Sequence, residues 1–278
     1  MLDKVVARVY ADTTGKYGGN FGAVVLDDQV VMIDSGMVHP HMTLVKEWVA
    51  KEFSLPITKL VYTHSHADHV LGAQGLGEAS RIGSEPMQQI CLMNMKDRWK
   101  KDTLLKGYEQ RKEERPEIWN ALQSIEIQLP DITFKDRLEI GIGDELQVRL
   151  LGGHTSGSSI VIVEPEHIVF IGDLIFNGVF PYIGDSSCNP DRWIMALQHV
   201  LEGDYTHIIS GHGHVCTNTE LEYQIEFFQS FRASVKEAIN DGITHDQYFK
   251  DGHMPHLYDE GVEGRAPNAT EFMFKFYS

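Results

Sequence analysis

Residues 63–69 (THSHADH) bring three histidines and one aspartate together, directly after a short apolar run. Buried imidazoles and carboxylates must be paired or bind a metal, because an isolated charge is costly inside a protein. The heptapeptide therefore predicts a chain that folds around a metal site. If the backbone is extended there, His64 and His66 point the same way and can share one metal. Asp68 and His69 lie beyond the turn and can reach a second metal.

Four other polar clusters also follow apolar runs that are typical of strands. They are residues 34–36 (DSG), 153–157 (GHTSG), 172–173 (GD) and 211–214 (GHGH). Each has a glycine beside a carboxylate or an imidazole, and glycine lets the backbone turn sharply. Because α/β sheets collect their sites at strand ends, we expect these clusters and the heptapeptide to meet at one place.

Short strands interleaved with helices predict an α/β fold with αββα layering. We expect strands at residues 5–9, 22–26, 30–33, 59–62, 147–151, 159–163, 168–171 and 207–210, and helices at 42–53, 193–201 and 217–240. Asn189 is a predicted helix cap, and Thr217 with Glu220 matches a capping box. Residues 86–124 are predicted to be a helical insertion, either a lid or a solvated connector. We expect one domain over residues 1–278, with C-terminal helices at about 217–260.

The amino-acid composition indicates which classes of partner to expect. The net charge is −16, from 24 Lys and Arg against 40 Asp and Glu, so no nucleic acid or anionic membrane partner is expected. A small-molecule substrate is expected, and a homo-oligomer stays open. Three distant cysteines, Cys91, Cys188 and Cys216, suit reduced thiols in a cytoplasm rather than a disulfide framework.

The successive motifs HxHxDH, GHTxGS, GD and GHG resemble those of the metallo-β-lactamase superfamily, and the match spans residues 34–212. The resemblance implies an αββα sandwich with two metal ions. It implies a first metal bound by His64, His66 and His154, a second bound by Asp68, His69 and His212, a bridging Asp173, and Asp34 as a buried organiser beside the site. Histidine-rich ligation with carboxylates favours zinc, with iron or manganese as alternatives.

Asp173 further resembles the bridging residue of the glyoxalase II-like hydrolases and their uncharacterised relatives. This branch implies cleavage of a small-molecule ester, thioester or lactone by a metal-bridging hydroxide, with Asp68 as the catalytic carboxylate that holds the proton. The alternatives are a β-lactamase-type amide hydrolase, a mononuclear iron persulfide dioxygenase, and a phosphodiesterase or nuclease. Tyr182 is a candidate oxyanion donor, although packing also explains an aromatic residue there. We expect residues 35–42, 86–124 and 176–183 to form the cleft walls.

Overall fold

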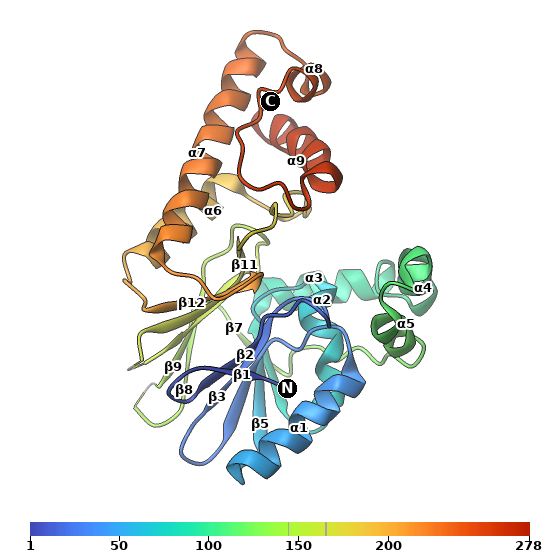
Figure 1. Ribbon diagram of the computed structural model, residues 1–278, viewed down its shortest axis with the longest axis vertical. Helices are drawn as coiled ribbons and strands as arrows, with labels where there is room; N and C mark the ends of the chain where they lie inside the picture. Colours follow the sequence, from blue (N-terminus) through green and yellow to red (C-terminus); the bar gives the residue numbers. More distant parts are fainter. Residues whose placement is uncertain (144, 165) are drawn as a thin grey trace.

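Two β-sheets stacked between layers of helices form the protein (Figure 1). The computed structural model describes residues 1–143, 145–164 and 166–278. One sheet has seven strands in the order β1-β2-β3-β4-β5-β6-β7, and the other has five in the order β12-β11-β10-β9-β8. The predicted αββα sandwich is confirmed.

The seven-stranded sheet comes from the first half of the chain. Its strands are β1 (Asp3–Val6), β2 (Val9–Asp12), β3 (Phe21–Val25), β4 (Val30–Ile33), β5 (Ile57–Val61), β6 (Ser80–Ser84) and β7 (Ile132–Phe134). The single strand predicted at residues 5–9 is wrong, because the chain turns back at Ala7 (φ 44°) and forms two antiparallel strands instead. The strands predicted at residues 22–26 and 30–33 are confirmed as β3 and β4, which pair antiparallel in a hairpin.

The five-stranded sheet carries the later motifs. Its strands are β8 (Arg137–Ile140), β9 (Leu146–Leu150), β10 (Ser159–Val163), β11 (Ile168–Phe176) and β12 (His207–His212). β11 runs past the predicted end at residue 171, so Asp173 lies inside an irregular strand and not after it. The irregularity is a register shift at Gly172, which has φ 54° and lies so close to Thr63 that a Cβ would be 2.5 Å from its Oγ1.

Helices lie beside the seven-stranded sheet, and a second group of helices extends from the strand ends of the five-stranded sheet (Figure 1). The segments α1 (His39–Phe53), α2 (Ala67–Val70), η1 (Leu71–Leu76), α3 (Glu85–Lys96), α4 (Lys101–Tyr108), η2 (Glu109–Arg111) and α5 (Pro116–Leu122) precede the second sheet. The segments α6 (Pro190–Leu201), α7 (Asn218–Asn240), α8 (His245–Lys250) and α9 (Val262–Tyr277) pack beyond it. None of the helices in the described ranges combines the length and apolar character needed to span a membrane.

The predicted insertion is helical, since α3, α4 and α5 lie between β6 and β7. The predicted end of the C-terminal helices at about residue 260 is wrong, because α9 continues to Tyr277. Pro267 lies inside α9 and Gly264 near its start, and both residues normally argue against a helix. Tertiary packing overrides them, since Ala266 and Met273 are fully buried.

The two predicted helix caps have different outcomes. Asn189 Oδ1 accepts a hydrogen bond from the Arg192 amide at 2.9 Å, so this cap is confirmed. The capping box is wrong, because the Thr217 side chain makes no cap hydrogen bond. Glu220 instead accepts hydrogen bonds from Gln224 and from the Tyr258 hydroxyl.

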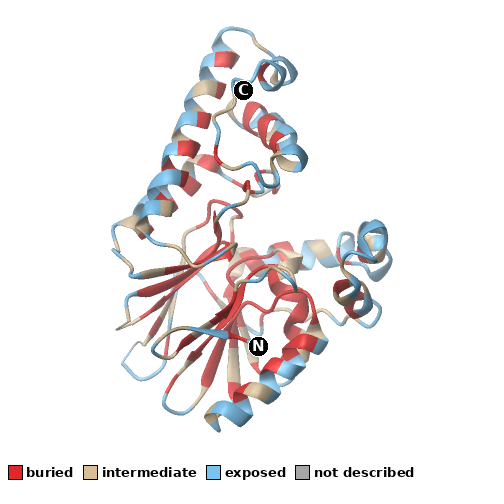
Figure 2. Ribbon diagram, viewed as in Figure 1, coloured by how far each residue is buried: buried red, intermediate tan, exposed pale blue. Residues whose placement is uncertain are grey.

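Apolar side chains fill the space between the two sheets, where the facing strands are almost wholly buried (Figure 2). The sheets approach so closely that a Cβ at Gly22 would lie 2.4 Å from the Phe170 ring. A second cluster joins the five-stranded sheet to the C-terminal helices through Trp193, Phe228 and Tyr248. The C-terminal helices therefore share a core with the five-stranded sheet, and this core fixes their position relative to the strand ends.

Candidate metal centre

All seven predicted ligand side chains meet at one end of the sandwich. His64 and His66 lie in the loop after β5, and both face the same part of the cluster, as expected. Asp68 and His69 lie in the single turn of α2. The other three, His154, Asp173 and His212, come from the loop after β9, from β11 and from the end of β12.

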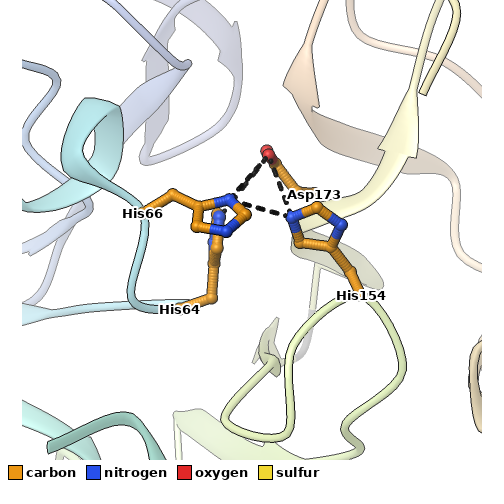
Figure 3. Close-up of side chains that lie close together, drawn as sticks. All are labelled: His64, His66, His154 and Asp173. Carbon is orange, nitrogen blue, oxygen red and sulfur yellow. Dashed lines mark hydrogen bonds and ion pairs between the residues drawn. The ribbon is translucent and has the colours of Figure 1, made fainter. Parts of the chain in front are cut away.

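Asp173 stands between two groups of imidazoles. Its Oδ2 lies 3.4 Å from His64 Nε2, 3.5 Å from His154 Nε2 and 3.9 Å from His66 Nδ1 (Figure 3). Within this first group the four ligand atoms lie within 4.8 Å of one another. Asp173 is buried, so both groups depend on a carboxylate shielded from water.

The other oxygen of Asp173 faces the second group. Its Oδ1 lies 3.0 Å from His69 Nε2 and 3.5 Å from His212 Nε2. Asp68 Oδ2 is 3.3 Å from the same His212 nitrogen. Asp68, His69 and His212 form a compact trio with ligand atoms within 4.8 Å of one another.

The donor atoms fit a metal. Among the described residues, His64 Nε2, His69 Nε2 and Asp173 Oδ1 are buried without a hydrogen-bond partner, which is rare in proteins. His69 Nε2 is close to Asp173 Oδ1, but the two atoms do not meet hydrogen-bond geometry. Metal ions satisfy such converging nitrogen and carboxylate atoms, and this donor set is typical of zinc.

Asp34 holds the second group in position. Its Oδ2 lies 2.8 Å from His69 Nδ1, which turns the free Nε2 of that ring toward the cluster. The same carboxylate accepts hydrogen bonds of 2.7 Å from the amide and the hydroxyl of Thr63. Thr63 Oγ1 in turn lies 3.0 Å from His64 Nδ1, so one buried network orients an imidazole of each group.

Asp185 orients the ring of His66, as Asp34 orients that of His69. No role was predicted for Asp185 from the sequence. Its Oδ2 lies 3.2 Å from His66 Nε2, which leaves Nδ1 of that ring facing the cluster. Its Oδ1 accepts hydrogen bonds from the Ser187 amide at 2.8 Å and hydroxyl at 2.6 Å. The one signal in the sequence is Asp-x-Ser, which is typical of a local turn and says nothing about a distant histidine.

The imidazoles of the cluster differ in their pKa and therefore in their charge. Burial lowers the pKa of His66, but Asp173 and Asp185 outweigh it and raise the pKa to about 9. Burial likewise lowers the pKa of His212, whereas Asp173 and Asp68 raise it to about 9. These two rings therefore neutralise the carboxylates beside them.

Burial lowers the pKa of His69, but Asp173 and Asp34 raise it well above its usual value, so this ring is also charged. His64, His154 and the two carboxylates are in the forms that bind metals. Burial lowers the pKa of His64, and it takes the pKa of His154 well below its usual value, so both rings are neutral. Burial alone would raise the pKa of Asp68 and of Asp173, but the nearby imidazoles, above all His212, hold both well below the usual range. Neutral imidazoles and ionised carboxylates are the ligating forms.

Two hollows of about 290 and 530 Å³ adjoin the cluster and share Asp68, His212 and Arg265, so they form one cleft. The smaller hollow is lined by residues that include Asn94, Arg98, Trp99, Phe176 and Tyr182. The larger one is lined by the loop 13–18 and by residues that include Tyr108, Arg115 and Ile118. The insertion and the segment after β11 are therefore walls, as predicted.

The prediction that residues 35–42 form a third wall of the cleft is wrong. These residues do not line either hollow in the described structure. The loop 13–18 covers them, and the Met37 amide donates a 2.7 Å hydrogen bond to the Tyr17 carbonyl. The sequence did not reveal this loop as a wall, nor Arg265 of α9.

Tyr182 lies at the edge of the cluster. Its ring meets those of His66 and His154 edge-on, with centroids 5.6 and 6.3 Å apart, and 37% of the residue is exposed. Burial raises the pKa of its hydroxyl, which keeps the group protonated. Its use as an oxyanion donor stays a prediction.

Comparison with known proteins gives the family. The profile described as the metallo-beta-lactamase superfamily matches residues 14–214, well over half of the chain. The chain belongs to the metallo-β-lactamase superfamily. Its homologues there are metal-dependent hydrolases, and this chain is an enzyme of that kind.

Solved structures share its fold at low sequence identity. A metallo-β-lactamase from Pontibacter korlensis aligns with a TM-score of 0.64 at 18% identity, over 82% of this chain and 98% of that one. One from Hirschia baltica gives 0.62 at 15% identity, over 82% and 97%. The inverting sec-alkylsulfatase Pisa1 from Pseudomonas sp. gives 0.79 at 16% identity, over 99% of this chain but 50% of that one. A comparison with curated proteins found no match.

Proposed function

We propose that this protein is a binuclear metal-dependent hydrolase that cleaves a small-molecule ester, thioester or lactone. The observation that carries the proposal is the position of Asp173, whose Oδ2 faces one imidazole group and whose Oδ1 faces the other. A carboxylate shared in this way is the usual bridge of a two-metal hydrolytic site. Zinc is the proposed metal, with iron or manganese as alternatives.

His64, His66 and His154 would hold the first ion, Asp68, His69 and His212 the second, and Asp173 both. When bound, the ions supply Lewis acidity and lower the pKa of a water molecule. Asp68 lines both hollows of the cleft, and its low pKa keeps it ionised, so it can accept a hydrogen bond from a water molecule beside the substrate. The protonated Tyr182 hydroxyl can donate a hydrogen bond to a developing oxyanion.

Sulfate esters form a second candidate substrate class. The alkylsulfatase aligns with 99% of this chain at a TM-score of 0.79, whereas the β-lactamases align with 82% at 0.62–0.64. The extra aligned length favours a sulfatase-like architecture over a β-lactamase-like one. The identity of 16% limits this to an argument from fold.

Metal analysis combined with a substrate panel tests the proposal. We expect two metal ions per chain by plasma mass spectrometry after loading with zinc or manganese. We expect kcat/KM to be highest for a thioester, lactone, carboxylic ester or alkyl sulfate, and lower for nitrocefin and for a phosphodiester.

A metal content that stays at one per chain, or that is strictly iron, contradicts the two-metal site and favours the dioxygenase. A tenfold preference for a β-lactam or a phosphodiester, about 1.4 kcal/mol of transition-state stabilisation, contradicts the substrate class alone.

A further inference from the structure

The cleft is rich in cations although the protein is strongly acidic. The net charge is −16, yet five basic residues line the two hollows: Lys16, Arg98, Arg111, Arg115 and Arg265. Basic side chains gathered in one cleft of an acidic protein draw anions to that cleft.

Three of the five are already paired with glutamates. Lys16 Nζ lies 3.3 Å from a carboxylate oxygen of Glu117. Glu114 lies 3.5 Å from Arg111 and 3.6 Å from Arg115. Glu117 and Glu114 offset two of these three charges, so these residues call less strongly for an anionic ligand than an arginine without a carboxylate partner.

Arg98 and Arg265 are different. Within the described residues, no carboxylate oxygen lies within 4.0 Å of either guanidinium group. Each of the other three basic side chains has such a partner. An exposed arginine without a partner is common, and Arg98 alone would carry no argument. Arg265 is only partly exposed, and it lines both hollows at their junction beside Asp68 and His212.

Arg265 is also held in a fixed orientation. Its Nη1 donates a 2.6 Å hydrogen bond to the Phe180 carbonyl, and its guanidinium lies over the Phe176 ring, 5.5 Å from the centroid. That ring stacks on the imidazole of His212 with centroids 5.0 Å apart and an interplanar angle of 8°. One stacked column therefore joins α9 to the candidate metal centre. A guanidinium has five N–H donors, so most of those of Arg265 remain for a ligand.

The two arginines approach the cleft from different sides. Arg98 lies between α3 and α4, and Arg265 lies in α9, which belongs to a separate group of helices in Figure 1. Both side chains line the smaller hollow together with Tyr182, so both charges reach the same part of the cleft.

We infer that Arg98 and Arg265 form an anion-binding subsite, and that the natural substrate carries an anionic oxyacid group beside the bond that is cleaved. Guanidinium groups match planar or tetrahedral oxyanions through paired hydrogen bonds, which gives this class its specificity. The anion is either a carboxylate close to the scissile ester or the scissile sulfate or phosphate group itself. The inference rests on the proposed hydrolase function and narrows its substrates.

The kinetic test uses the zinc-loaded full-length protein and matched aryl esters. The pair is 4-nitrophenyl butyrate, which is neutral, and mono-4-nitrophenyl succinate, which carries a carboxylate. Two further arms, 4-nitrophenyl sulfate and 4-nitrophenyl phosphate, place the anion on the scissile group. For the preferred anionic substrate, we expect Arg98→Gln and Arg265→Gln each to raise KM about tenfold, as expected for loss of a charged hydrogen bond. We expect the KM of the butyrate to change less than about twofold.

Two variants serve as controls. Arg265→Lys keeps the charge and should restore part of the affinity lost in Arg265→Gln. Arg137→Gln removes a positive charge from β8, where the side chain is 76% exposed, and should leave all four substrates unchanged. An equal rise in KM for neutral and anionic esters would overturn the subsite, because it would show that the arginines only support the cleft.

A binding measurement separates this inference from the proposed function. Succinate, sulfate and phosphate are each titrated by calorimetry into the zinc-loaded wild type and into the Arg98→Gln/Arg265→Gln variant. A loss of affinity of about tenfold or more for at least one anion supports the subsite even if no ester is cleaved. Equal affinities in the two proteins, or no binding of any anion, overturn it even if esters are cleaved.

Discussion

The candidate metal centre and the cleft around it are built in opposite ways. Four of the seven candidate ligands in the centre are buried, and three of its imidazoles (those of His64, His66 and His69) have a polar partner on the nitrogen that faces away from the cluster. The cleft walls come from the loop 13–18, the insertion and α9, and most of their polar side chains are at least partly exposed. The centre is thus specified by short-range hydrogen bonds, whereas the walls depend on how separate helices pack.

This difference separates chemistry from specificity. Changes in the buried centre should remove activity on every substrate, because they act on the groups that bind metal. Changes in the walls should alter the choice of substrate and leave metal binding intact. The predictions below test this division, from the largest expected effect to the smallest.

Asp173→Ala should have the largest effect. It removes the carboxylate that faces both imidazole groups, and we expect kcat/KM to fall by more than about 100-fold on every substrate, since even residues behind metal ligands are worth about 10–100-fold. The bound metal should fall below two ions per chain. Asp246→Ala, at an exposed aspartate of α8, is the control and should retain full activity. Wild-type metal content in Asp173→Ala would show that the carboxylate is not a bridge.

Asp185→Asn and Asp34→Asn should weaken metal binding about 10–100-fold, each at a different site. Asp185 contacts His66 of the first group, and Asp34 contacts His69 of the second. Competition with a chromogenic chelator resolves the two affinities, and we expect each variant to lower only one of them. If both variants lower the same affinity, the division into two groups is incorrect.

Gly19→Ala should reduce activity by about tenfold while the protein stays folded. A Cβ at this position would lie 2.3 Å from His69 Nε2, so the imidazole or the loop must move. A displacement of about 1 Å can cost about 100-fold in rate, and part of this strain is relieved by loop movement. The matched control is Gly107→Ala in α4, where a Cβ meets no described atom within 4 Å. That variant should be active and slightly more stable, by about 0.4–1 kcal/mol.

The same contrast explains what could be predicted from the sequence. Each of the seven candidate ligands lies in a short motif beside a glycine or another ligand, so local spacing was enough to single it out. Asp34 was found in the same way. Asp185 and Arg265 were not, because each acts on a residue more than 80 positions away and neither lies in a local motif that reports this contact.

For the fold as well, features with a local sequence signal were predicted, and features that depend on long-range packing were not. The apolar runs predicted most strands, because a buried strand needs continuous apolar residues wherever it lies. Asp173 was placed after its strand, since a register shift that continues β11 cannot be inferred from a charged residue in an apolar run. α9 was missed because Gly264 and Pro267 are tolerated in it only through packing against the core.

Arg111→Gln should have the smallest effect and gives the sharpest test of the walls. Arg111 lines the same cleft as Arg265 but is exposed and paired with Glu114, and such surface pairs contribute about 0–1 kcal/mol. If the cleft attracts anionic substrates only through its overall field, Arg111→Gln and Arg98→Gln should raise KM equally. The effect should then vanish in both at about 0.15 M salt and above, where the screening length is about 8 Å. If Arg98 and Arg265 bind the anion directly, Arg111→Gln should change KM less than about twofold, and the Arg98→Gln effect should persist in salt. Measuring KM for both variants at low and high ionic strength distinguishes a diffuse field from a specific subsite.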